Sequence, residues 1–298
     1  MAEHLITSKL LKRLEQFELI AKRRTKATMK GERRSRARGL SVEFADHRNY
    51  SHGDDLRYLD WNLYGRLDRL FLKLYEEERE LPVTIFLDCS ESMSFGEPRK
   101  FDFARQVTAA AGYVALAGYD RVSVRLFPSL KENELVGADL RSVRGRKSAM
   151  RFFQNINQLA AGSTASFNES LYRGAIESRA SGLALVLSDF LDPEGYEKGL
   201  NTLISHGFQV SAVQILAPEE IEPSTYGDLR LVDSETANET EVTFGHYRLE
   251  QYQKTVRNFC QRLNEFCLSR GIAYFNVSSA ASLEDLFLKE MRAAGVFG

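Results

Sequence analysis

From residue 83 onward the sequence alternates short apolar runs with longer amphipathic ones, and this alternation limits the possible folds most. The runs VTIFL (83–87) and LALVL (183–187) are apolar throughout, as expected for strands covered on both faces. Segment 100–117 has helical period instead. Strands separated by helices imply βαβ units and a mostly parallel sheet. Further strands are expected at 121–127, 134–140 (an edge strand), 208–216 and 272–277, and helices at 147–159, 167–178, 194–205 and 247–269.

The predicted fold class is therefore α/β, a doubly wound, mostly parallel sheet with additions. An inserted β-hairpin is expected at about 226–245, where two alternating runs flank turn residues. Residues 1–81 form an N-terminal helical and β extension, with a helix over 5–21 and a strand over 70–75. We thus predict two parts, 1–81 and an α/β domain over 82–298.

The composition is that of an ordinary globular protein, with 43% hydrophobic and 27% charged residues among 298. No run of about 18 apolar residues is present, so we expect no membrane span. The N-terminus lacks the pattern of a signal peptide. Three cysteines without CxxC spacing indicate reduced thiols, and we predict a cytoplasmic protein.

Polar oxygen donors follow two of the predicted strands and precede one helix. Asp88, Ser90 and Ser92 come directly after one buried strand, Asp189 ends another, and Thr164 lies before a helix. Alternate residues of an extended chain share one side, and the ligand of a doubly wound sheet lies beyond the carboxyl ends of its strands. The set is hard and oxygen-only, which suits Mg²⁺ or Mn²⁺. We predict a metal site at these five residues.

Two carboxylates against a divalent ion leave the predicted site near neutral and short of one strong ligand. Such a site is suited to accept an acidic side chain from a partner protein. In the alternative without a metal site, the serine hydroxyls only cap the next helix. A phosphatase with Asp88 as nucleophile would need a second Asp two residues on, where Ser90 stands.

The three clusters resemble the metal-ion-dependent adhesion site (MIDAS) of von Willebrand factor A domains. The matching residues are Asp88, Ser90, Ser92, Thr164 and Asp189. The sequence GSTASFNESL departs from the Gly-Gly-Thr of many such domains. The resemblance implies a von Willebrand A-like fold and a protein-binding role that depends on a metal.

The region before the first buried strand is similar to a MoxR-associated family with von Willebrand A-like domains, known as domain of unknown function 58. The resemblance is carried mainly by Arg48, Asp54, Asp55, Arg57, Asp60 and Trp61. It implies a MoxR-type AAA+ ATPase as partner, in a chaperone-like system that assembles or activates client proteins. Many relatives have membrane helices before this region, and that feature is not carried over to this chain. The signature residues form either an ion-pair cluster with Trp61 buried beneath it, which we favour, or a docking surface.

A basic segment, residues 22–38, holds nine basic residues and one acid. It could bind phosphate groups of nucleic acid or lipid, but it has no aromatic residues for base stacking, which disfavours nucleic-acid binding.

The chain has no Walker A motif, so ATP hydrolysis would come from a partner. We predict a non-enzymatic, metal-dependent binding module. The alternatives are a metal-dependent hydrolase and nucleic-acid binding through residues 22–38.

Overall fold

The computed structural model describes residues 5–17, 42–77, 81–127, 140–162, 166–178, 181–223, 227–232, 239–244 and 246–297. By its contacts the chain divides into two compact units, Met1–Ala21 with Leu81–Gly298 and, separately, Lys22–Glu80. The first helix, α1 (Ser8–Leu14), contributes Leu10 and Leu14 to the core of the larger unit. The domain division at residue 81 stays a prediction.

A six-stranded sheet forms the centre of the larger unit. Its order is β10-β7-β6-β3-β4-β5, and every neighbouring pair is parallel except β4 with β5. The strands are β3 (Pro82–Asp88), β4 (Arg121–Phe127), β5 (Leu140–Arg144), β6 (Leu183–Ser188), β7 (Gln209–Leu216) and β10 (Ala273–Ser278). This confirms the predicted doubly wound, mostly parallel sheet.

The winding direction of the sheet reverses between its two central strands. From β3 the chain continues outward to β4 and β5, and it then returns to β6 on the other side of β3. The carboxyl ends of β3 and β6 therefore meet at a topological switch point, where doubly wound sheets bind their ligands.

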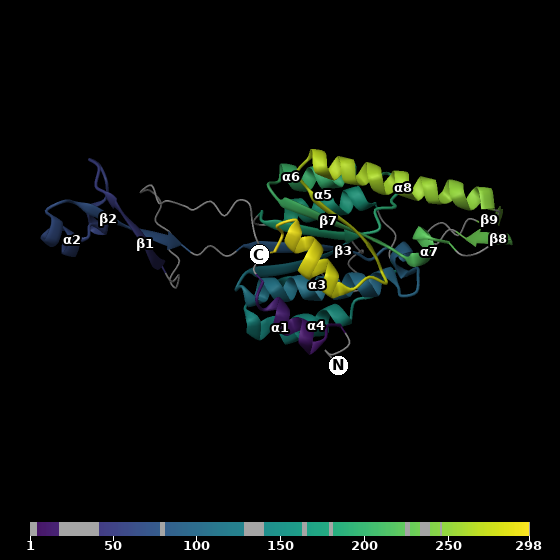
Figure 1. The fold of residues 1–298 in the computed structure, drawn as a ribbon, viewed down its shortest axis with the longest axis horizontal. Helices are drawn as coiled ribbons and strands as arrows, with labels where there is room; N and C mark the ends of the chain where they lie inside the picture. Colours follow the sequence, from purple (N-terminus) through teal and green to yellow (C-terminus); the bar gives the residue numbers. More distant parts are fainter. Residues whose placement is uncertain are drawn as a thin grey trace. The chain divides into compact units, whose positions relative to one another are not determined.

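Helices cover both faces of this sheet (Figure 1). Leu10 and Leu14 of α1 join the buried side chains of α3 (Lys100–Ala117) and α4 (Ala149–Asn157) in one core cluster. A second cluster lies under α5 (Phe167–Glu177), α6 (Glu197–Ser205) and α8 (His246–Ser269). The shorter helical segments are η3 (Glu91–Ser94), η4 (Arg146–Ser148), α7 (Pro218–Ile221), α9 (Leu283–Asp285) and the π-helical η5 (Leu286–Met291). None of the helices in the described ranges is both long and apolar enough to cross a bilayer.

The predicted antiparallel edge strand lies mostly outside the described residues. It was expected at 134–140; residues 128–139 are not described, and the described edge strand, β5, runs over Leu140–Arg144. Val143 of β5 pairs with Val122 of β4 and packs on the core. The predicted hairpin is confirmed as β8 (Gly227–Val232) paired with β9 (Glu239–Phe244).

The smaller unit contains an antiparallel pair of strands, β1 (Val42–Asn49) and β2 (Phe71–Glu77). Between them the chain forms η2 (Leu56–Tyr58) and α2 (Trp61–Leu67). The strand expected at 70–75 is confirmed as β2, whereas β1 and α2 were not predicted.

The prediction that Trp61 is buried is wrong. Its relative exposure is 64%, and its ring lies edge-on to Tyr64, which is itself exposed. The cause is local, because Asp60 is the buried residue. The Asp60 carboxylate accepts hydrogen bonds from the main chain at the start of α2 and lies 2.9 Å from His47 Nε2. Trp61 is the first residue of α2 and directly follows this N-cap residue, and its side chain is not buried under the Asp60 contacts.

Candidate metal centre

Asp88 is the last residue of β3, and its side chain is buried at the switch point. Its Oδ1 accepts a hydrogen bond from the Ser90 main-chain NH (2.8 Å), and its Oδ2 accepts one from Ser188 Oγ (2.5 Å). Because Leu87 of β3 pairs with Leu187 of β6, the last residues of the two strands, Asp88 and Ser188, come together. Two sequence clusters separated by about a hundred residues of chain thus meet, as predicted.

The two serines after Asp88 connect it to Asp189. Ser90 Oγ lies 3.0 Å from Ser92 Oγ, and Ser92 Oγ donates to Asp189 Oδ2 over 2.8 Å. Ser90 stands at the start of η3, but its side chain makes no capping hydrogen bond. The alternative in which these hydroxyls only cap the next helix is therefore not what the structure shows.

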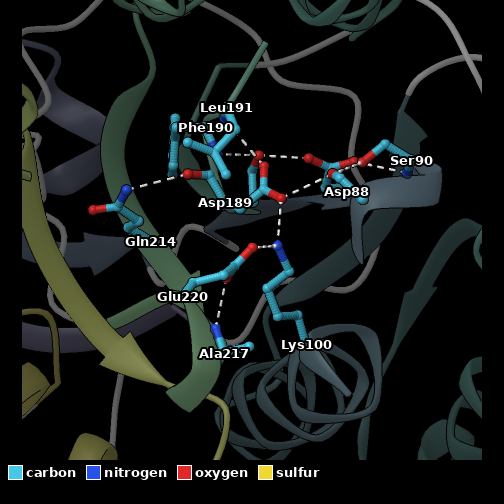
Figure 2. Close-up of polar contacts among 11 residues, drawn as sticks. Asp88, Ser90, Lys100, Asp189, Phe190, Leu191, Gln214, Ala217 and Glu220 are labelled. Carbon is cyan, nitrogen blue, oxygen red and sulfur yellow. Dashed lines mark hydrogen bonds and ion pairs between the residues drawn. The ribbon is translucent and has the colours of Figure 1, made fainter. Parts of the chain in front are cut away.

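Lys100, at the start of α3, completes this network, and the sequence analysis did not single it out. Its side chain is 0% exposed, and Nζ lies 2.8 Å from Asp189 Oδ2 and 2.6 Å from Glu220 Oε1. Figure 2 shows the ammonium group between the two carboxylates. Glu220 of α7 is held in turn by the main-chain NH of Ala217 (2.7 Å).

A signal for Lys100 was present in the helical period. Lys100, Ala104, Val107 and Ala111 recur at intervals of three and four, which places them on one face of α3. A lysine on an apolar face that is buried requires a carboxylate partner. The pattern could not name the partners, which lie 89 and 120 residues further along the chain.

The charges of the network alter its protonation equilibria. Burial, together with the nearby Asp189 carboxylate, raises the pKa of Asp88 to about 7. Burial lowers the pKa of Lys100, but Asp189 and Glu220 outweigh it, so the net pKa is raised. Burial likewise raises the pKa of Glu220 against the opposing effect of Lys100. The raised pKa of Asp88 shows that its buried surroundings disfavour the ionised carboxylate, and a cation bound beside it would relieve this cost.

The residues present fit a hard divalent cation. Asp88, Ser90, Ser92 and Asp189 offer carboxylate and hydroxyl oxygens in one hydrogen-bonded network, the donor type that Mg²⁺ and Mn²⁺ prefer. No group of three or more His, Cys, Asp or Glu side chains suited to a metal occurs in the part of the chain that the structure describes. A metal here would rely on the two carboxylates and the serines.

The fifth predicted ligand cannot be placed. Residues 163–165, and Thr164 with them, lie outside the described residues. The loop leading to it is anchored near the network, because the Gly162 NH donates to the Cys89 carbonyl over 2.9 Å. Four of the five predicted residues therefore come together, and metal binding by all five stays a prediction. The basic segment 22–38 also lies outside the described residues, so nucleic-acid binding through it stays a prediction too.

The signature residues of the smaller unit form three separate ionic contacts instead of one cluster. Arg48 pairs with Asp54 (2.6 Å) across the turn at Gly53. Arg57 pairs with Asp55 (2.5 Å) at the surface. Asp60 contacts His47 and Lys73. A docking role for this region stays a prediction.

Comparisons with known proteins place the chain among uncharacterised relatives. A family model described as "Protein of unknown function DUF58" matches residues 46–260. The "Uncharacterized protein Mb1516" of Mycobacterium bovis (strain ATCC BAA-935 / AF2122/97) is 26% identical over 233 residues, 76% of this chain and 72% of that protein. Two solved structures are similar at lower identity. The "conserved hypothetical protein BatB from Bacteroides thetaiotaomicron" has a TM-score of 0.38 at 16% identity, covering 72% of this chain and 98% of that one. The "von Willebrand factor type A from Catenulispora acidiphila" has a TM-score of 0.33 at 17% identity, covering 48% and 34%.

Proposed function

The chain belongs to the DUF58 family of proteins of unknown function, and from this membership we propose that its α/β unit is a non-enzymatic, metal-dependent protein-interaction module. The observation that carries the proposal is the network of Asp88, Ser90, Ser92 and Asp189 at the switch point of the sheet. These groups come from two different strand ends and face one another in a buried position, where the Asp88 carboxylate lacks a cationic partner of its own among the contacts described.

In the proposed mechanism the chain provides the fixed part of a docking site. Asp88 is held by Ser90 and Ser188, and Asp189 is held by Ser92, Lys100 and the Leu191 NH, so both carboxylates are oriented before a partner arrives. A bound Mg²⁺ or Mn²⁺ would supply an open coordination position for a carboxylate oxygen of the partner. Preorganised side chains of this kind reduce the entropy lost on binding.

We further propose that the module acts with a MoxR-type AAA+ ATPase in chaperone-like assembly or activation of clients. This part rests on the family resemblance. A cytoplasmic location also stays a prediction, based on the three cysteines, none of which forms a disulfide in the described part of the chain.

Calorimetric titration of Mg²⁺ and of Mn²⁺ tests the metal site. We expect saturable binding by the full chain and its loss in Asp88→Ala. Glu169→Gln is the matched control, because it removes a surface carboxylate that pairs only with Arg173 on α5 in the contacts described. Equal binding by wild type and Asp88→Ala rejects the site.

Co-precipitation with a purified MoxR-type ATPase from the same organism tests the partner. Retention of the ATPase in Mg²⁺, with loss in EDTA and in Asp88→Ala, is the expected result. Retention that is unaffected by EDTA and by the substitution would contradict a metal-dependent contact.

A further inference from the structure

We propose that Lys100 is a resident cation of the candidate metal centre, and that the Lys100–Glu220 ion pair sets the affinity of the centre for divalent ions. This inference rests on the proposed metal binding. It concerns two residues that lie outside the predicted ligand set.

The geometry shows that Lys100 acts on a ligand directly. Its Nζ and Ser92 Oγ both donate to the same oxygen, Asp189 Oδ2, over 2.8 Å each. Lys100 is fully buried, and Asp189 is 2% exposed, so water screens this interaction very little. A cation on a buried ligand oxygen lowers the negative potential that the site offers to a divalent ion.

Glu220 opposes this effect. Its Oε1 accepts from Lys100 Nζ over 2.6 Å, and its Oε2 accepts from the Ala217 NH, so the carboxylate is held beside the ammonium group (Figure 2). The negative charge of Glu220 thereby offsets part of the positive charge that Lys100 places at the site. The formal net charge of the network is equal and opposite to that of one divalent cation when all of its groups are ionised. These groups are Asp88, Asp189, Glu220 and Lys100.

A purely structural role is the alternative. The pair could serve only to tie α3 to α7. Buried ion pairs, however, often add little stability over well-packed apolar residues, so stability alone is a weak reason for one here. The two roles differ in what they predict for metal affinity when one charge at a time is removed.

The test is a double-mutant cycle in which Mn²⁺ affinity is measured by calorimetry at constant ionic strength. Lys100→Met removes the positive charge and is expected to tighten binding by about tenfold. Glu220→Gln removes the negative charge and is expected to weaken binding by about tenfold. The double variant has the wild-type net charge and is expected to bind within a few-fold of wild type. Far-UV circular dichroism verifies the fold of each variant.

A second measurement applies if Lys100→Met folds poorly without metal. Its thermal midpoint should then rise more on addition of Mn²⁺ than that of the wild type, because tighter binding to the folded state stabilises more. Opposite shifts for the two single variants, with reversal in the double variant, support the proposal.

The remaining outcomes separate the failure of this inference from that of the proposed function. If wild type binds Mn²⁺ but both single variants bind equally well or both bind more weakly, Lys100 and Glu220 are structural and the inference is overturned, while the metal site stands. If only Lys100→Met binds, Lys100 replaces the metal in the wild type, which supports the inference and overturns the proposed metal dependence. If no form binds, both are overturned.

Discussion

Asp88 is the residue of the candidate metal centre whose pKa is most affected by burial and by a neighbouring charge. Its carboxyl is buried beside Asp189, and its pKa is raised to about 7. In the unfolded chain an aspartate has a pKa near 3.9. Between these values the folded protein binds the extra proton, so ionisation of Asp88 costs stability as the pH rises through this window. At neutral pH the ionised Asp88 carboxylate therefore lowers the stability of the folded protein, unless a bound cation compensates its charge.

Asp88→Asn should reveal this cost. In EDTA, the free energy of unfolding of the wild type should fall by about 2–3 kcal/mol more than that of the variant between pH 5 and pH 8, since only the wild type carries the raised pKa. At pH 8 the variant should be the more stable protein. Urea unfolding at the two pH values measures both. Parallel pH profiles would show that the Asp88 pKa is not raised.

The proximity of Asp88 and Asp189 was predictable from sequence because each lies at the end of a predicted strand. The alternation of a strand and the pairing of β3 with β6 are enough to bring Asp88 and Asp189 together. Lys100 and Glu220 were not predictable as a pair, since their contact depends on how α3 and α7 pack and no local pattern encodes it. Sequence reasoning thus predicted that the polar side chains at the strand ends come together, but it missed Lys100, which contacts Asp189 from α3.

At the scale of elements, the larger unit was predicted well because its segments have strong periods. Helix α3 was expected at 100–117 and lies at Lys100–Ala117, since one face of it is apolar along its whole length. Strand β1 was missed because VEFADHRN is mostly polar. Helix α2 was missed because it has only seven residues and its ends are set by Asp60 and by Asp68 in the left-handed conformation, and not by an apolar stripe.

Gly112 permits the packing of α3 against α4. A Cβ atom placed there would lie 2.3 Å from Cε1 of Phe152, which is buried in the same core. Alanine normally stabilises a helix interior relative to glycine by up to about 1 kcal/mol. We nevertheless expect Gly112→Ala to destabilise the protein by about 1–3 kcal/mol, because the Phe152 ring must move in a close-packed core. Urea unfolding measures the difference.

The matched control for Gly112→Ala is the same substitution with a smaller neighbour. In a Phe152→Leu background, Gly112→Ala should cost less than it does in the wild type, since the contacting ring atoms are gone. Equal costs in the two backgrounds would show that the close contact with Phe152 is not the cause.

At the scale of the whole molecule, the chain consists of two units that differ in how their apolar residues are used. The α/β unit buries its large side chains in two core clusters. The smaller unit exposes several apolar side chains on and around η2 and α2, namely Leu56, Tyr58, Trp61, Tyr64 and Leu67. Contiguous exposed apolar surface is typical of interaction sites. They are compatible with the docking alternative for the signature region, which stays a prediction.

Trp61 is the one tryptophan of the sequence, so its fluorescence reports on the smaller unit alone. Because the side chain is 64% exposed, we expect acrylamide to quench the native protein nearly as efficiently as the protein in urea. Unfolding followed by this fluorescence should also not coincide with unfolding followed by circular dichroism, which is dominated by the helices of the larger unit. Trp61→Phe serves as the blank for tyrosine emission. Strong protection of the native indole from acrylamide would contradict this expectation. It would mean that the apolar side chains of α2 are covered in solution.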